Sequence, residues 1–204
     1  MSDPIRIVIA EDQTLVLGAI AALLTLEDDF CIIGQACDGR AALTMVRELR
    51  PDILLTDVEM PGLSGIELAH AVMAERLPVR VIVVTTYARP GYLTRARAAN
   101  VSGYLLKVAP AAELVNAIRT VYRGGIVIPV DLAEAAREAG ADPLTDRERD
   151  VLRLAEEGMP NRDIGERLNL SAGTVRNYLS EAASKLYAAN RIEAVRIARA
   201  NGWL

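Results

Sequence analysis

The chain of 204 residues has little cysteine or histidine and no long apolar run. Cys31 and Cys37 have no metal-ligand spacing, so we interpret them as small apolar residues on a buried strand and just past its end, without a disulfide. The single His70 has no serine or cysteine motif around it for a triad, which predicts a solvated helix position. No apolar run reaches the roughly 20 residues that cross a bilayer. The opening MSDPIRIVIAED lacks the basic start and apolar core of a signal peptide, so we expect a soluble, cytoplasmic protein.

Negative charge is concentrated in the N-terminal part of the chain. The formal net charge is −4, and residues 142–204 carry ten basic and ten acidic residues. The preceding residues carry 13 basic and 17 acidic ones. The chain is therefore not generally attractive to nucleic acid, and any DNA binding must come from a local patch.

Short β-branched runs alternate with helical patterns over residues 1–123. The predicted strands are 5–10, 31–36, 52–57, 79–85 and 103–106. The predicted helices are 13–26, 39–49, 64–75, 90–100 and 110–123. This alternation predicts an α/β, (βα)5 doubly wound domain with a parallel sheet covered on both faces. Functional groups in such folds gather at the carboxyl ends of the strands.

The remaining sequence predicts a linker and an all-α domain. The linker, 124–142, opens with glycines and has an Ala/Glu-rich middle that is a candidate helix. Residues 143–204 contain only helical patterns, separated by short breaks, at 145–157, 160–168, 171–187 and 190–201. Four short helices joined by tight breaks are typical of a helix-turn-helix domain.

Three carboxylates are predicted to meet at one edge of the sheet. Glu11 and Asp12 follow the first strand, and Asp57 ends the third. For one such acid, a helix N-cap is the simpler interpretation. Together they repel and need a counterion, and a set of oxygen ligands without His or Cys suits Mg²⁺. We expect the backbone carbonyl of Glu59 to join this metal site.

Two further strand ends supply a hydroxyl and an ammonium. Thr85 ends the fourth strand, and Lys107 follows the fifth. A carboxylate surrounded by a divalent cation, a hydroxyl and a lysine can take up a phosphoryl group, with Asp57 as nucleophile. The coincidence of five residues at strand ends favours this site over separate helix caps.

These motifs resemble the receiver domain of bacterial response regulators. The matching residues are E11-D12, D57 with M60-P61-G62, T85, and G103-Y104-x-x-K107. The resemblance implies that Asp57 accepts phosphate from a sensor histidine kinase, that Thr85 then moves toward the phosphate, and that Tyr104 changes rotamer. A plain edge-strand aromatic is the alternative for Tyr104. Val108 departs from the family, whose members commonly carry an acid there.

The third helix of the C-terminal domain has two distinct faces. The predicted buried stripe is Val175, Leu179, Ala182 and Leu186. The opposite face carries Gly173, Arg176, Asn177, Ser180 and Ser184. Arginine suits guanine and asparagine suits adenine in a major groove, although a solvated helix face is the alternative.

The whole segment resembles the helix-turn-helix of the LuxR/NarL type. The matching phrases are L144-T-D-R-E-R-D-V-L, N161-R-D-I-G-E-R-L, S171-A-G-T-V-R-N-Y-L, K185-L and N190-R-I-E-A. The resemblance implies that Arg176, Asn177 and Ser180 contact bases of double-stranded DNA. It implies phosphate-side contacts for Thr174 and Lys185, and pairing of domains through the last helix.

Other phrases resemble one subgroup of the family. They are E11-D-Q-x-L-x-L-G, L26-E-D-D and T85-T-Y-A-R-P-G-Y. They are similar to the subgroup that includes cold-responsive regulators of fatty-acid desaturase genes. Such a likeness does not fix the target genes.

The first helix lacks the polar outer face that a helix covering a sheet normally shows. We expect Leu15, Val16, Ala19, Ile20 and Leu23 to pack inward. Leu17 and Ala21 would then point outward. An exposed apolar stripe suggests that phosphorylation promotes a homodimer through this helix, together with 110–123. The alternative is simple tolerance of exposed alanine and leucine.

The leading interpretation is a transcription regulator of a two-component system, which assists only its own phosphorylation and dephosphorylation. One alternative is a Mg²⁺-dependent phosphohydrolase, in which Asp57 is the nucleophile and Glu59 the general acid. Another is a DNA-binding regulator that is independent of phosphorylation. The inactive state is either monomeric or held by a receiver that covers the recognition helix.

Overall fold

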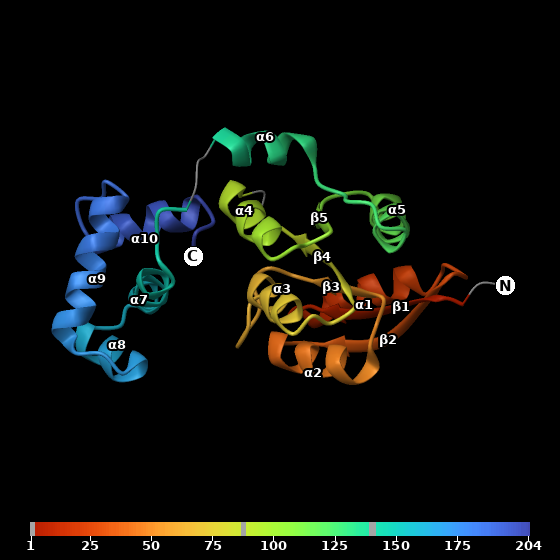
Figure 1. Cartoon of the computed structure of the whole chain (residues 1–204), viewed down its shortest axis with the longest axis horizontal. Coiled ribbons are helices and arrows are strands. Elements are labelled where there is room, and N and C mark those ends of the chain that lie inside the picture. Colours follow the sequence, from red (N-terminus) through yellow and green to blue (C-terminus); the bar gives the residue numbers. More distant parts are fainter. Residues whose placement is uncertain (1–2, 87–88, 139–141) are drawn as a thin grey trace. The chain divides into compact units, whose positions relative to one another are not determined.

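The computed structural model describes residues 3–86, 89–138 and 142–204. The chain divides into two compact units, one formed mainly by residues up to Glu134 and the other mainly by residues from Ala135 onward (Figure 1). Tyr87 and Ala88, in one of the subgroup phrases, and 139–141, in the predicted linker, lie outside the described residues. Among the residues described, no helix combines the length and apolar character that crossing a membrane requires.

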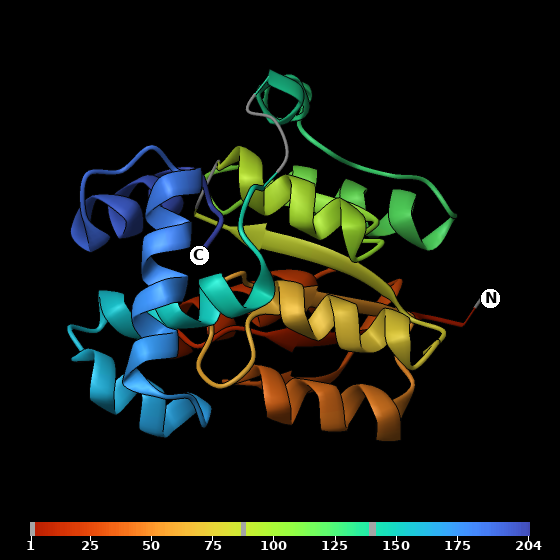
Figure 2. The same ribbon diagram turned by 60° about the vertical axis from the view of Figure 1, so that its left-hand side comes forward.

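The first unit is a parallel sheet with helices on both faces (Figure 2). Its strands are β1 (Ile5–Ala10), β2 (Phe30–Ala36), β3 (Ile53–Thr56), β4 (Arg80–Thr85) and β5 (Gly103–Leu106). Its helices are α1 (Thr14–Leu24), α2 (Gly39–Leu49), α3 (Gly65–Ala74), α4 (Pro90–Ala98) and α5 (Ala111–Tyr122). The strand order β2-β1-β3-β4-β5 confirms the predicted doubly wound α/β fold and makes β1 and β3 neighbours.

One face of this sheet packs against α1 and α5. Every second residue of the central strands faces this side of the sheet. These residues, among them Ile7, Ile53 and Ile82, form one apolar cluster with residues of both helices. Arg119 on α5 adds a polar link, because its guanidinium donates to Asp29 and Glu27 in the loop after α1. The two helices are thus held side by side over the same layer of the core.

The predicted orientation of α1 is wrong. Leu17 and Ala21 are buried, with 6 % and 7 % of their surface exposed, whereas Leu15 is 87 % exposed. Leu17, Ala21 and Leu24 form the inward stripe. Of the residues predicted to pack inward, Ile20 and Leu23 are half-buried and do pack against the core. The helix is apolar on almost every side, so its periodicity could not identify the inward face.

The cysteines are free, as predicted, and lie on a strand and just past its end, but both are exposed rather than buried. Cys31 lies on β2, which is an edge strand, opposite the exposed Arg6 of β1. The edge of the sheet is less fully covered than its centre, and Cys37 follows the strand end. His70 is exposed on α3, as predicted.

Four of the described helices surround the core of the second unit. They are α7 (Asp146–Glu156), α8 (Asn161–Leu168), α9 (Ala172–Lys185) and α10 (Arg191–Ala200). The predicted capping box at the start of α7 is present, with Thr145 and Glu148 bonding each other's backbone. Buried core residues include Val151, Ile164, Val175, Ala182, Ala194 and Ala198. The candidate helix in the linker is also present, as α6 (Val130–Glu138).

The buried position of Leu17 predicts a large loss of stability on truncation. We expect Leu17→Ala to lower the free energy of unfolding by about 2–5 kcal/mol, because it removes a core side chain and leaves a cavity. The matched control is Leu15→Ala on the same helix, which we expect to change it by less than about 0.5 kcal/mol. Amide hydrogen exchange in β1, β3 and β4 of the full chain measures both values. Equal losses in the two variants would contradict this orientation of α1.

Candidate functional site

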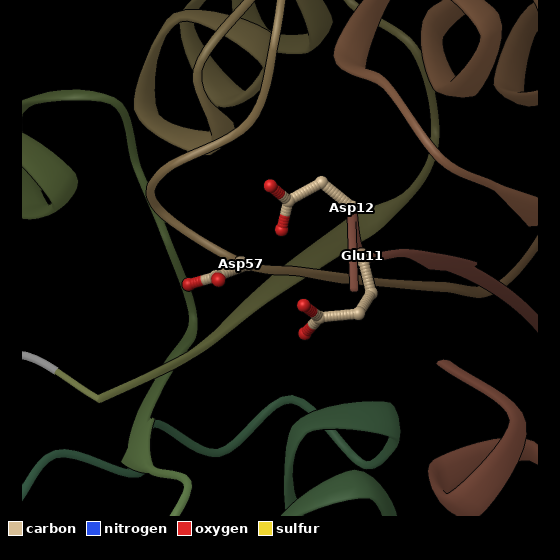
Figure 3. A group of neighbouring side chains, drawn as sticks. All are labelled: Glu11, Asp12 and Asp57. Carbon is tan, nitrogen blue, oxygen red and sulfur yellow. The ribbon is translucent and has the colours of Figure 1, made fainter. Parts of the chain in front are cut away.

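Three carboxylates converge at the carboxyl ends of β1 and β3. Glu11 and Asp57 are buried, with 2 % and 5 % of their surface exposed, and Asp12 is exposed. One oxygen of each lies within 4.8 Å of the others, as predicted from the adjacency of the strands (Figure 3). Three negative charges at this distance repel one another, so the site favours a cation among them.

Lys107 provides positive charge within the cluster. Its ammonium lies 2.7 Å from Glu11 Oε2 and 2.7 Å from Asp57 Oδ2. Its backbone N–H donates to the carbonyl of Thr85 at 2.8 Å, which fixes the end of β5 against the end of β4. Lys107, which follows β5, thus contacts the acids at the ends of both β1 and β3.

The site perturbs the protonation of two of these groups. Burial lowers the pKa of Lys107, but its hydrogen bonds to Asp57 and Glu11 outweigh this and raise the pKa above its ordinary value. Burial raises the pKa of Glu11 above its usual range; its hydrogen bond with Lys107 opposes the change, and the nearby charge of Asp57 adds to it. Lys107 therefore remains a cation at neutral pH.

The backbone around Asp57 holds the carboxylate in place. The N–H of Val58 donates to Asp57 Oδ1 at 2.6 Å, while Lys107 donates to the other oxygen. A Cβ on Gly65, the first residue of α3, would lie 1.8 Å from the carbonyl oxygen of Asp57, so only glycine fits there. Sequence reasoning did not identify Val58 or Gly65, because a backbone donor and a close approach leave no pattern of side-chain types.

Thr85 and Tyr104 lie on β4 and β5, the two strands that follow β3 in the sheet order. Both are fully buried, Thr85 at the end of β4 and Tyr104 within β5. The ring of Tyr104 is thus already in the interior, and its predicted change of rotamer would start from there. Glu59 lies two residues beyond Asp57 and is half-buried, and the role of its carbonyl stays a prediction.

The donor set fits a hard divalent cation. Carboxylate oxygens of Glu11, Asp12 and Asp57 gather from two strand ends, and the exposed Asp12 leaves one side open to water. Mg²⁺ prefers oxygen ligands and retains water, whereas zinc and copper prefer nitrogen or sulfur. The chemistry of these residues therefore suits Mg²⁺ together with a phosphate.

Helix α9 presents the predicted polar face. Arg176, Asn177 and Ser180 are exposed, and Val175 and Leu179 on the other side are buried. Thr174 has both its N–H and its hydroxyl within hydrogen-bonding distance of the Ser171 hydroxyl, at the helix N-cap. Tyr178, between these exposed residues in the sequence, is half-buried and packs against the core.

The turn before α9 is tight. Asn169 adopts a left-handed conformation, with φ 55°, and ends α8. A Cβ on Gly165 would lie 2.6 Å from the carbonyl oxygen of Leu170, so α8 and the turn approach each other closely only because this residue is glycine. This geometry fixes the direction in which α9 leaves the turn.

Lys185 has a protein partner in addition to its predicted role at a phosphate. Its ammonium donates to Glu148 Oε2 at 2.8 Å, and Glu148 is only 1 % exposed. Burial raises the pKa of Glu148, but Lys185 and the N-cap bonds with Thr145 outweigh this and lower the pKa below its ordinary value of 4.5. The pair ties the last turn of α9 to the first turn of α7.

Comparison with protein families matches both units. The family described as response regulator receiver domain matches residues 7–119, and the family described as bacterial regulatory proteins, luxR family, matches residues 142–198. The chain is a LuxR-type response regulator. All the strand-end residues described above lie in the first match, and the exposed face of α9 lies in the second.

Two relatives match this response regulator over nearly the whole length of both chains. It is 44 % identical to the transcriptional regulatory protein DesR of Bacillus subtilis, over 98 % of each chain. It is 46 % identical to the uncharacterized transcriptional regulatory protein YvfU of the same organism, over 98 % of this chain and all of the relative. This response regulator is therefore a transcription regulator with a receiver and a DNA-binding domain.

A solved protein–DNA complex has a similar chain. The structure of the two-component response regulator RcsB–DNA complex matches with a TM-score of 0.64 and 25 % identity, over 97 % of this chain and 99 % of that one. The likeness spans both domains of the response regulator.

The Glu148–Lys185 pair predicts a specific loss of stability. We expect Lys185→Met to lower the free energy of unfolding of the C-terminal domain by roughly 1–3 kcal/mol, because Glu148 is left buried without a cation. Trp203, the only tryptophan of the chain, is buried in this domain, so its fluorescence during urea unfolding reports the loss. Adding Glu148→Gln should restore part of it. A Lys185→Met domain as stable as the parent would contradict this role.

The pair also predicts how this domain responds to acid. Because the folded pKa of Glu148 lies below 4.5, its stabilisation is present above that pH and is lost as the pH falls through the folded value. The same unfolding measurement in Glu148→Gln should show a smaller loss on acidification than in the parent protein.

Proposed function

We propose that this regulator takes a phosphoryl group on Asp57 and binds DNA in response. The observation that carries the proposal is the convergence of Glu11, Asp12, Asp57 and Lys107 at the ends of three strands. A sensor histidine kinase is the expected donor. An oxygen of Asp57 attacks the phosphorus, the N–P bond of the phosphohistidine breaks, and the imidazole leaves with the bonding electron pair. The product on this chain is an acyl phosphate.

The residues of the site have separate parts in this transfer. The N–H of Val58 orients one oxygen of Asp57, so the other is directed into the site. Lys107 can move its hydrogen bond from that oxygen to the incoming phosphoryl group and neutralise its charge. Thr85, at the next strand end, offers a hydroxyl donor to the product.

Magnesium would be held by Glu11, Asp12, Asp57 and the carbonyl of Glu59. When bound, it neutralises negative charge on the phosphoryl oxygens and offsets the repulsion among the carboxylates. The buried Glu11 and the exposed Asp12 place donors at different depths of the site. The phosphoryl donor can therefore approach from the solvent side.

We also propose that the protein turns over no separate substrate. Glu59 has the spacing of a general acid in aspartyl-phosphate phosphohydrolases, but Lys107 already gives Asp57 its electrostatic partner. A second folded domain with an exposed Arg- and Asn-bearing helix supports a binding output rather than a metabolic one.

The output is DNA recognition by α9. Arg176, Asn177 and Ser180 share one exposed face near the start of the helix, where side chains can reach base edges in the major groove. The N-cap at Ser171 and the packing of Val175 and Leu179 hold this face rigidly. Rigid presentation of a few donors is what direct readout of a sequence requires.

Phosphorylation at Asp57 is tested directly on the purified chain. We expect acetyl phosphate with Mg²⁺ to produce a retarded band on Phos-tag gels in the parent protein and in the control Asp28→Ala, an exposed acid outside the site. Asp57→Ala should show no such band, because the nucleophile is gone, and EDTA should abolish it in the parent. A retarded band that persists in Asp57→Ala would disprove the assignment.

We further propose that the phosphorylated regulator dimerises through α1 and α5. The supporting feature is an apolar groove of about 400 Å³ between these helices, with Leu15 and Ala19 exposed on its rim. Its lining also includes Val16, Ile20, Leu23, Ala111 and Leu114. An exposed apolar surface of this kind is typical of a protein interface. Leu17 and Ala21 are excluded from it, since they are buried beneath the helix.

Two alanines on α1 provide a matched test of this surface. Ala19 and Ala22 are both exposed, but only Ala19 lines the groove. We expect Ala19→Glu to weaken dimerisation of the phosphorylated protein by about tenfold or more, a loss of about 1.4 kcal/mol. Ala22→Glu should dimerise as the parent does. Analytical ultracentrifugation with acetyl phosphate measures both, and normal dimerisation of Ala19→Glu would exclude this face.

A further inference from the structure

The start of the linker pairs with the sheet as a short additional strand. Val127 forms a parallel bridge with Gly103 of β5. Its N–H donates to the carbonyl of Ser102 at 3.0 Å, and its carbonyl accepts from the N–H of Tyr104 at 2.8 Å. β5 is the last strand in the sheet order, so the linker covers its otherwise free edge.

Val127 lies only a few residues from the end of α5 and from the start of α6. Gly124, with φ 95°, turns the chain after α5, and Gly125 donates to the carbonyl of Thr120 at 2.9 Å. Val127 packs against the core of the first unit. Helix α6 begins three residues later at Val130, so little slack separates the paired residue from the helix that follows.

The strand that holds the linker is also the strand that reaches the acceptor site. Tyr104 donates its backbone N–H to Val127, and its ring is fully buried. Three residues further, Lys107 forms its ion pair with Asp57. β5 has only four residues, Gly103–Leu106, so a displacement at one end is transmitted along a short, stiff segment to the other.

A pocket beside this strand provides room for such a displacement. It has a volume of about 390 Å³, and Tyr104 and Leu106 of β5 line it on one side. Val127, Pro129 and Val130 of the linker line the other side. The walls are mostly apolar, so side chains and backbone can shift there without leaving a buried charge unpaired.

We propose that the backbone pairing of Val127 with β5 carries the phosphorylation state of Asp57 into the linker. The proposal rests on the phosphorylation of Asp57 proposed above. When Lys107 exchanges the carboxylate of Asp57 for a phosphoryl group, the end of β5 moves, and Tyr104 moves with it. Tyr104 donates its backbone N–H to the carbonyl of Val127. When Tyr104 moves, the linker either moves with it, together with the start of α6, or loses its pairing with β5.

Two substitutions at one position separate backbone pairing from side-chain packing. Val127→Pro removes the N–H that donates to Ser102, whereas Val127→Ala keeps it and only shortens the side chain. Fluorescence anisotropy with a labelled duplex, selected from random-sequence DNA by the phosphorylated parent protein, gives the gain in affinity when acetyl phosphate is added. Phos-tag gels confirm that each protein is phosphorylated to the same extent.

We expect Val127→Pro to lose about fivefold or more of the affinity gain, a change of the size that allosteric coupling usually produces. Val127→Ala should stay within about twofold of the parent. A normal gain in Val127→Pro would overturn the proposal, and so would an equal loss in Val127→Ala. If the parent itself gains no affinity, the proposed function fails instead, which distinguishes the two failures.

Hydrogen exchange tests the same pairing without any substitution. In the unphosphorylated parent, the amides of Val127 and Tyr104 should exchange slowly, because each donates within the pairing. Phosphorylation should change the exchange of both amides, relative to that of Ile53 in the centre of the sheet. Identical exchange at Val127 and Tyr104 in the two states would overturn the proposal. This measurement uses only the parent protein, so it holds even if Val127→Pro does not fold.

Discussion

The ion pairs of Lys107 with Glu11 and Asp57 connect most of what this molecule is proposed to do. They join the ends of β1, β3 and β5 in one buried site, and each 2.7 Å contact offsets part of the repulsion among the carboxylates. A phosphoryl group or a metal ion bound in such a cluster would change the electrostatic partner of every charged group in it. The chemistry of Asp57 and the position of β5 are therefore coupled through one side chain.

The two domains have different physical requirements. In the proposed function the N-terminal domain must respond to one new charge, and buried polar groups at the carboxyl end of an otherwise apolar sheet suit that task. The C-terminal domain must present α9 in a fixed orientation, and Gly165, the N-cap at Ser171 and the Glu148–Lys185 pair fix it. This division suits a regulator in which phosphorylation changes the affinity for DNA while the conformation of the DNA-binding domain stays the same.

The fold and the acceptor residues could be predicted from sequence because strong periodic patterns carry them. Apolar strands gave the sheet, and the acids, Thr85 and Lys107 stand directly at strand ends. The orientation of α1 could not be predicted, since Leu15 and Leu17 are equally apolar and only packing distinguishes them. Backbone contacts at Val58 and Val127 were equally hidden, because the main chain donates there whatever the side chain is. The glycine at position 65 is visible in the sequence, but the carbonyl that it lies against is not.

Charge on Asp57 is proposed to control the binding of DNA by α9. The most direct measurement is the affinity of the 204-residue chain for the selected DNA duplex, at fixed salt and Mg²⁺, with and without beryllofluoride as a mimic of the phosphoryl group. We predict a gain of about 5- to 150-fold in the parent protein, the usual range of coupling between two sites, and no gain in Asp57→Ala. Equal affinity of the parent protein in both conditions would contradict the claim.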